Sequence, residues 1–233
     1  MHRPSQLPLV LPHDPHYGRD AFMPGASNAA ALRLVESWPG WPSPVVVLSG
    51  PPGSGKTHLV HVWAARANAE ILAAAALGGE LSLDQTGAGP LAIDGIDPGA
   101  VPDAALFHLI NRVGELGSSL LLTSRQPADC WRIALPDLRS RLRMAAPASI
   151  GAPDDDLLRI VLVKLFADRQ LVVDRPVIDY LLTRMERSLS AANALVDALD
   201  QAGLAENRRI TRPMAAEILA ASDGRTETFA VRQ

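Results

Sequence analysis

The sequence predicts an α/β three-layer sandwich built on a parallel sheet, followed by a small all-helical domain. Short apolar runs bounded by turn residues are typical of buried parallel strands, and they alternate with stretches of helical periodicity. A glycine-rich loop follows the first of these runs. After Gly151 only amphipathic helical patterns remain, which indicates a second and smaller domain.

The expected strands of the sandwich are Val45–Gly50, Leu91–Asp94 and Ser119–Ser124. Between them, the stretch after Lys56 and the stretch that begins at Asp103 repeat apolar residues at helical spacing. Because strand and helix alternate along the chain, helices are expected on both faces of one sheet.

Four amphipathic stretches are expected to form the helical domain: residues 154–170, 175–188, 190–203 and 211–222. Asp154, Asp174 and Thr211 are predicted to cap helix starts, and Gly203 is predicted to end the third helix. The predicted organisation is an extended arm (1–19), the α/β domain (20–150), the helical domain (151–222) and a flexible tail (223–233), which is polar and lacks periodicity.

Composition and charge exclude several classes of protein. The chain of 233 residues is 48% hydrophobic and carries a formal net charge of -3 without a local basic block, so neither its overall charge nor a patch favours nucleic acid. The single cysteine, Cys130, cannot form an internal disulfide, and no secretory signal or membrane-spanning run is present. We therefore expect a cytoplasmic protein with no membrane association and no sequence-specific DNA binding.

The segment GPPGSGKT fits the phosphate-loop pattern G-x-x-x-x-G-K-[ST] and lies between an apolar strand and a helix. Backbone N–H groups of such a loop surround phosphate oxygens, and the helix N-terminus favours negative charge. In this pattern Lys56 reaches the β and γ phosphates and Thr57 holds Mg²⁺. The predicted nucleotide-binding residues are Gly50, Pro51, Pro52, Gly53, Ser54, Gly55, Lys56, Thr57 and the adjoining His58.

An acidic residue on a neighbouring strand is the next requirement, and Asp94 in LAIDGID is predicted to hold Mg²⁺ through water. Most hydrolysing proteins of this fold class place a second carboxylate directly after that aspartate to orient the attacking water, but this chain has Gly95 there. Asp97 is better explained as a turn residue before Pro98. Weak ATP hydrolysis by the chain itself is therefore expected.

Together, GKTHL, the order of the strands and the helical domain after the sandwich resemble the AAA+ ATPases of the bacterial replication initiator clade, DnaA and its shorter paralogues. The resemblance covers residues 20–222 and implies an AAA+ P-loop NTPase fold with a helical lid, ADP or ATP as ligand and Mg²⁺. FMPGASNAAAL resembles the segment whose backbone and apolar side chains hold the adenine, which implies a nucleotide contact for Phe22.

Three further segments resemble functional elements of that clade. LPDLRSRLRMA resembles the stretch that carries an arginine finger, which implies this role for Arg141, with Arg139 as the second choice. MERSLSAANALVDALD resembles the second sensor helix, which implies that Arg187 faces the nucleotide from the lid. SLLLTSRQP ends in the position of the first sensor, where Thr123 or Ser124 contacts the γ phosphate side.

Because the sequence ends shortly after the last expected lid helix, no helix-turn-helix DNA-binding domain is expected. This combination resembles the Hda family of regulatory inactivators of DnaA. That family carries near its N-terminus a motif of the pattern Q-L-x-L-x-L for the sliding clamp of the replicative polymerase, and Gln6, Leu7, Leu9 and Leu11 match it.

The resemblance implies a negative regulator of DNA replication initiation. Such a protein binds adenine nucleotide, with ADP as the working ligand, docks on the β subunit of the DNA-loaded clamp and presents Arg141 to ATP held by DnaA. A second copy of the chain is a further expected partner. Two alternatives remain: a self-sufficient AAA+ ATPase such as a helicase loader, which would sustain turnover, and a P-loop nucleotide kinase, which needs an arginine-rich second substrate site in its lid.

Overall fold

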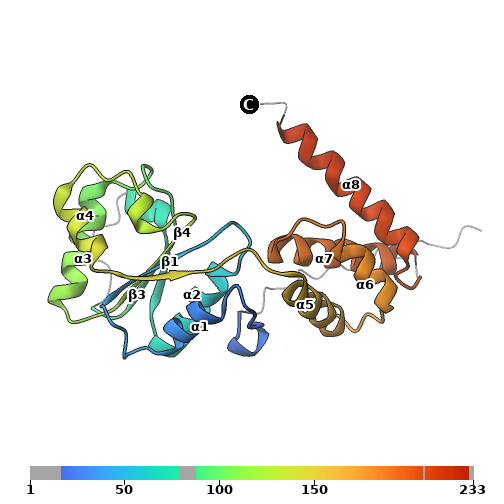
Figure 1. The fold of residues 1–233 in the computed structure, drawn as a ribbon, viewed down its shortest axis with the longest axis horizontal. Coiled ribbons are helices and arrows are strands. Elements are labelled where there is room, and N and C mark those ends of the chain that lie inside the picture. The colour runs from blue at the N-terminus through green and yellow to red at the C-terminus, as the bar shows by residue number, and fades with distance from the viewer. Residues whose placement is uncertain (1–16, 79–87, 207, 231–233) are drawn as a thin grey trace, which may run out of the picture. The chain divides into compact units, whose positions relative to one another are not determined.

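In the computed structural model, residues 17–78, 88–206 and 208–230 are described. They divide into two compact units, which meet in the sequence between Asp154 and Asp155. The first unit holds all the described strands, and the second is helical (Figure 1). The predicted change from an α/β domain to a helical domain is thus confirmed.

The described strands of the first unit form one parallel sheet in the order β2-β3-β4-β1-β5. The predicted strands are β1 (Val45–Ser49), β3 (Leu91–Ile96) and β4 (Leu120–Ser124). The edge strands β2 (Glu70–Ala73) and β5 (Ala146–Ser149) were not predicted, since each has four residues and is only partly buried, so neither forms the continuous apolar run of a central strand.

Alternate residues of β1 enter two separate hydrophobic cores, which makes the unit three-layered. Val45 and Val47 pack in the core formed with α3 (Asp103–Glu115) and α4 (Pro136–Arg143). Val46 and Leu48 pack in the core formed with α1 (Ala29–Glu36) and α2 (Lys56–Ala67). Figure 1 shows the two helix pairs on opposite faces of the strands. Short 3-10 turns complete the unit at Arg19–Ala21, Ala74–Gly78 and Ala128–Cys130.

The second unit contains α5 (Asp155–Asp168), α6 (Arg175–Leu182), α7 (Leu189–Glu206) and α8 (Arg212–Ala230). Apolar side chains from all four helices share one core, in which Leu158, Leu181, Val196 and Ala215 are fully buried. The predicted caps Asp154, Asp174 and Thr211 each lie immediately before a helix.

Two predictions about the lid helices were wrong. Helix α7 continues past Gly203 to Glu206. The following chain packs closely on this glycine, since an added Cβ would be 3.4 Å from the carbonyl oxygen of Arg208. Helix α8 continues to Ala230, where a flexible tail was expected from residue 223. Extending a helix that has already formed adds one hydrogen bond per residue, so a polar sequence can continue it.

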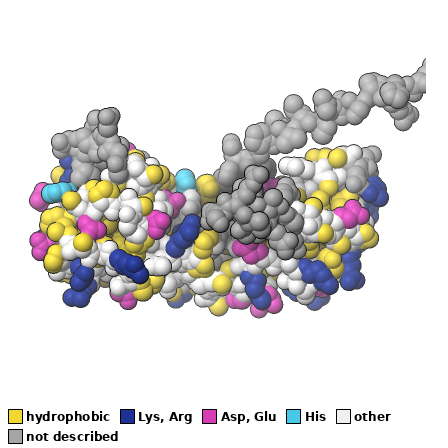
Figure 2. All heavy atoms as spheres, turned by 90° about the horizontal axis from the view of Figure 1, so that it is seen from above, with side chains coloured by type: hydrophobic (Ala, Val, Ile, Leu, Met, Phe, Trp, Pro, Cys, Tyr) yellow, Lys and Arg dark blue, Asp and Glu magenta, His cyan; other side chains and the backbone are white. Residues whose placement is uncertain are grey.

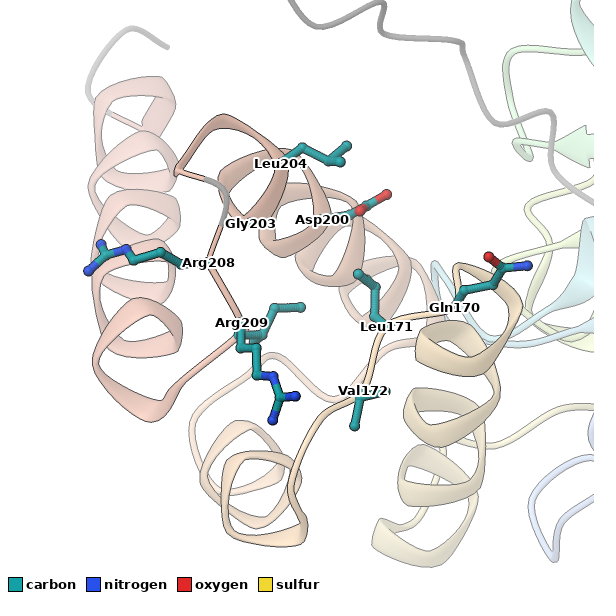
Figure 3. Close-up of a pocket in the computed structure, with 9 residues that line it drawn as sticks. Gln170, Leu171, Val172, Asp200, Gly203, Leu204, Arg208 and Arg209 are labelled. Carbon is teal, nitrogen blue, oxygen red and sulfur yellow. The ribbon is translucent and has the colours of Figure 1, made fainter.

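A shallow pocket of about 400 Å³ lies in the lid, between the end of α5 and the chain that leads from α7 to α8 (Figure 3). Its wall combines the apolar side chains of Leu171, Val172 and Leu204 with the charged groups of Asp200 and Arg209. None of the residues predicted to bind nucleotide lines it.

On the face shown in Figure 2, basic and acidic side chains are interspersed rather than gathered into one block. No helix within the described residues has the length and apolar character to cross a membrane.

Candidate nucleotide-binding site

The phosphate loop joins the end of β1 to the start of α2, as the motif predicts. Gly53 and Gly55 have φ values of +67° and +101°, a backbone conformation that residues with a side chain rarely adopt. The first turn of α2 leaves backbone N–H groups without helical partners. The loop therefore presents hydrogen-bond donors at the carboxyl edge of a parallel sheet, where ligands of such sheets bind.

Gly50 is required because the sheet closes tightly around the end of β1. Its N–H donates to the carbonyl oxygen of Ser124, at 3.2 Å, and the neighbouring Ser49 carbonyl accepts from the N–H of Ile150, at 2.8 Å. An added Cβ at position 50 would lie 2.5 Å from the carbonyl oxygen of Ile150. Only glycine, which has no Cβ, therefore fits at the end of β1 between β4 and β5.

Lys56 bends back over the loop, and its Nζ donates to the carbonyl oxygens of Gly50 and Pro51, at 2.7 and 2.8 Å. Burial lowers the pKa of Lys56 below its ordinary value; the charge of Asp94 opposes that shift, and the charge of Arg125 adds to it. The ammonium thus stands beside a second cation and is hydrogen-bonded to neutral carbonyls. An anionic phosphate at the loop would act in the same direction as Asp94 and stabilise the charged form of Lys56.

The carboxylate of Asp94 is held by two threonines. Thr57 Oγ1 donates to Asp94 Oδ2, at 2.8 Å, and Thr123 Oγ1 donates to Asp94 Oδ1, at 2.5 Å. A hydroxyl has one proton and two lone pairs, so Thr57 donates its proton in the hydrogen bond to Asp94 and keeps its lone pairs for a metal. Hydroxyl, carboxylate and water oxygens are ligands that Mg²⁺ accepts. The donor set therefore fits Mg²⁺ at Thr57, with Asp94 acting through water.

The segment before the first strand packs on the start of α2. Phe22 is 3% exposed and meets the ring of His58 edge to face, with the ring centroids 5.2 Å apart. His58 Nε2–H donates to the carbonyl oxygen of Gly18, at 2.9 Å. The structure thus brings the predicted residues Phe22 and His58 together beside the phosphate loop.

Sequence reasoning missed three residues around this site. Asn28 is 1% exposed and shapes the same segment: its Oδ1 accepts from the N–H of Gly25, and its Nδ2 donates to the carbonyl oxygen of Met23. Tyr17 stacks on His61 of α2, with ring centroids 4.2 Å apart. The hydrogen bonds of Asn28 are local. Tyr17 and His61 are distant in the sequence, so no local pattern signals their contact.

Arg125 is the third missed residue, and its position in the sequence could have identified it. It follows β4 directly, and the register that places Ser49 opposite Ser124 sets Arg125 beside Gly50. Since parallel strands end at the same edge, any residue that follows β4 lies near the phosphate loop.

The two arginines considered for the finger differ in their contacts. Arg139 Nη2 donates to the carbonyl oxygen of Ile133, at 2.5 Å, so its guanidinium is tied to its own unit. Arg141 is exposed, and its guanidinium makes no hydrogen bond or ion pair with any residue that the structure describes. Leu138 and Leu142 are the buried residues of α4, and Arg141 lies outside that buried stripe.

The remaining predicted residues do not belong to the first unit as the structure describes it. Arg187 belongs to the lid, in the connection between α6 and α7, where it forms an exposed ion pair with Asp155 at the start of α5. The clamp-motif residues Gln6, Leu7, Leu9 and Leu11 lie outside the described residues.

Comparison with known proteins identifies the lid and the fold. Residues 155–219 match the family model of the lid domain of Hda. Domain III of the Thermotoga maritima replication initiation protein DnaA superposes with a TM-score of 0.76 at 16% identity, over 91% of this chain and 98% of that one. AMPPCP-bound DnaA from Aquifex aeolicus superposes with a TM-score of 0.67 at 20% identity, over 82% of this chain and 67% of that one. A variant of Thermotoga maritima RuvB gives 0.66 at 16% identity, over 84% and 69%. The first unit therefore has the AAA+ fold that was predicted.

Proposed function

We propose that this chain, an Hda-like protein with a DnaA-type AAA+ fold, is a cytoplasmic negative regulator of DNA replication initiation that stimulates ATP hydrolysis by DnaA. The proposal rests on a combination of features in one chain. The lid matches the Hda family, and the nucleotide site has a phosphate loop but no carboxylate directly after Asp94. An AAA+ protein built in this way retains its own nucleotide and acts on a partner.

The proposed ligand is an adenine nucleotide with Mg²⁺, and ADP is the working form. The phosphate loop, Lys56 and the pair of Thr57 and Asp94 support the phosphate and metal part of this proposal. The Aquifex aeolicus DnaA that shares the fold is bound to AMPPCP. Without a water-orienting carboxylate at position 95, an ATP molecule held here is hydrolysed slowly, which disfavours a self-sufficient helicase loader.

The proposed active group toward DnaA is the guanidinium of Arg141. A planar cation that reaches the γ phosphate stabilises the charge that develops on the phosphate oxygens during transfer. The guanidinium of Arg141 is exposed and has no hydrogen bond or ion pair in the described part of the chain, so it is available to a partner. The same face can also meet a second copy of this chain.

The proposed route to DNA is the clamp motif in the N-terminal arm. The arm was predicted over residues 1–19, but Tyr17 and Gly18 contact α2 and Arg19 begins a 3-10 turn, so these three residues belong to the first unit. An extended peptide with alternating leucines offers apolar anchors to a groove on a partner, and the three prolines at positions 4, 8 and 12 reduce the entropy lost on docking.

Replacing both Gln6 and Leu9 with alanine is expected to abolish capture of the chain by immobilised sliding clamp. A hydrophobic anchor such as Leu9 carries about 2 kcal/mol or more, so losing it together with the polar contact of Gln6 lowers affinity by at least about thirtyfold. A pulldown measures the loss, and His2→Ala in the same arm serves as the control. Undiminished capture of the double variant contradicts the clamp assignment.

The function itself is tested in a reconstituted initiation assay. ATP-loaded DnaA is first incubated with the chain and with clamp-loaded DNA, and its initiation activity is then measured. The proposal expects activity to fall only when the chain and loaded clamp are both present. Unchanged initiation activity would refute a negative regulator of DnaA.

A further inference from the structure

We propose that Thr123 is a positioning residue, which aims the carboxylate of Asp94 at the Mg²⁺ of ADP and ATP alike and makes no contact with a γ phosphate. The inference rests on the proposed binding of adenine nucleotide, and it reassigns a residue that the first-sensor resemblance places on the γ phosphate side. Its basis is an irregularity in the sheet beside the phosphate loop.

The irregularity is a β-bulge at the end of β3. Ile93 pairs with Leu122 and Ile96 pairs with Ser124, so β3 has two residues where β4 has one. Asp94 and Gly95 therefore both oppose Thr123. A bulge re-aims the side chains at its position, and here it brings a carboxylate and a backbone N–H to the same hydroxyl.

The hydrogen bonds of this hydroxyl leave it no proton for a phosphate. Gly95 N–H donates to Thr123 Oγ1, at 2.8 Å, and Thr123 Oγ1 donates its one proton to Asp94 Oδ1. Thr123 is also completely buried. A contact with a γ phosphate oxygen would require the hydroxyl to release Asp94 and to leave this buried position.

The same bonds determine how Asp94 is oriented. Thr57 holds Oδ2 from the phosphate loop, and Thr123 holds Oδ1 from β4, so neither carboxylate oxygen can turn without breaking a bond. Each oxygen accepts one of these hydrogen bonds and keeps a further lone pair for water on a metal. The carboxylate is thus directed before any nucleotide arrives.

The backbone of Gly95 completes this hydrogen-bonded arrangement of Thr123 and Asp94. Its φ of +81° is strained for residues with a side chain, and this conformation delivers its N–H to Thr123. An added Cβ would meet no atom within 4 Å, so space does not exclude a carboxylate at this position. The backbone conformation of the bulge disfavours one, and the site that results binds a metal nucleotide without orienting water.

The test compares the affinities of wild type and Thr123→Val for ADP and for ATP, with Mg²⁺ and with EDTA. In Mg²⁺ the substitution is expected to weaken both nucleotides by the same factor, about tenfold, as the loss of a charged hydrogen bond implies. In EDTA the affinities are expected to be unchanged. Thr123→Ser keeps the hydroxyl and is expected to restore wild-type values. Ser149→Ala, at the same edge of the sheet, is the control.

Three results would overturn the inference: a loss confined to ATP, which marks a γ phosphate contact; an equal loss in Mg²⁺ and EDTA, which marks a general structural role; and no loss at all. If Thr123→Val does not fold, Thr123→Cys, which replaces the hydroxyl with a weak thiol donor, is expected to show a smaller Mg²⁺-dependent loss. These measurements use nucleotide and Mg²⁺ alone, so they are independent of any failure to act on DnaA.

Discussion

Arg141→Ala is expected to remove nearly all of the chain's stimulation of ATP hydrolysis on DnaA. Arginine fingers contribute factors of about 10³ to 10⁵ to phosphoryl transfer, so the stimulated rate should fall by at least about 10³. Because Arg141 is exposed and pairs with no residue that the structure describes, its removal should leave folding and nucleotide binding unchanged. Phosphate release from ATP-loaded DnaA, with clamp-loaded DNA present, measures the effect.

Two neighbouring variants separate a finger from a general basic surface. Arg143→Ala removes an exposed arginine from the same helix and should retain stimulation. Arg141→Lys keeps the charge but loses the planar guanidinium with its paired N–H donors, so it should recover only a small part of the stimulated hydrolysis rate. If Arg139→Ala abolishes stimulation while Arg141→Ala retains it, the finger is Arg139 and the assignment is wrong.

Gly50→Ala is expected to abolish nucleotide binding. The new methyl would lie 2.5 Å from the carbonyl oxygen of Ile150, so the end of β1 and the phosphate loop must shift. Overpacking of this kind costs about 1 to 3 kcal/mol, less than the stability of a typical domain, so the chain should fold with a lower melting temperature. Titration with ADP and Mg²⁺, together with a thermal melt, measures both effects.

Gly114→Ala provides the matched control for this substitution. Gly114 lies inside α3, and an added Cβ there would meet no atom within 4 Å. The control should bind nucleotide as wild type does and gain about 0.5 to 1 kcal/mol of stability, because alanine favours helix over glycine. Wild-type affinity in Gly50→Ala would show that the loop tolerates the shift and that its geometry has been misjudged.

Much of the fold could be predicted because burial leaves a local pattern. The central strands β1, β3 and β4 are covered by helices on both faces, so they read as continuous apolar runs. The edge strands β2 and β5 are short and half exposed, and their pairing partners are distant in sequence. Their position is set by tertiary contacts, which a single sequence does not display.

The candidate site also has one part that a local pattern predicts and another part that depends on tertiary contacts. The residues from Gly50 to Thr57 form one continuous motif whose spacing is imposed by the phosphate it surrounds, so they could be named from the sequence. The bond between Thr57 and Asp94 joins positions 37 residues apart, and the role of Thr123 depends on a bulge in another strand. Composition and spacing contain no information about such a bulge.

The lid shows the limit of local rules for helix ends. Glycine often ends a helix, but Gly203 lies within α7, and the following backbone packs closely on it. That approach depends on the packing of the chain before α8, and it could not be inferred from the residues around position 203.

The central claim is that the ATP hydrolysed belongs to DnaA and that this chain supplies the stimulus. The most direct measurement loads DnaA with γ-labelled ATP, loads this chain with unlabelled ADP, and combines the two on clamp-loaded DNA in a single turnover. We predict that labelled phosphate is released much faster with the chain than without it. Equal release with and without the chain, or release only when the label is loaded on the chain itself, would contradict the account.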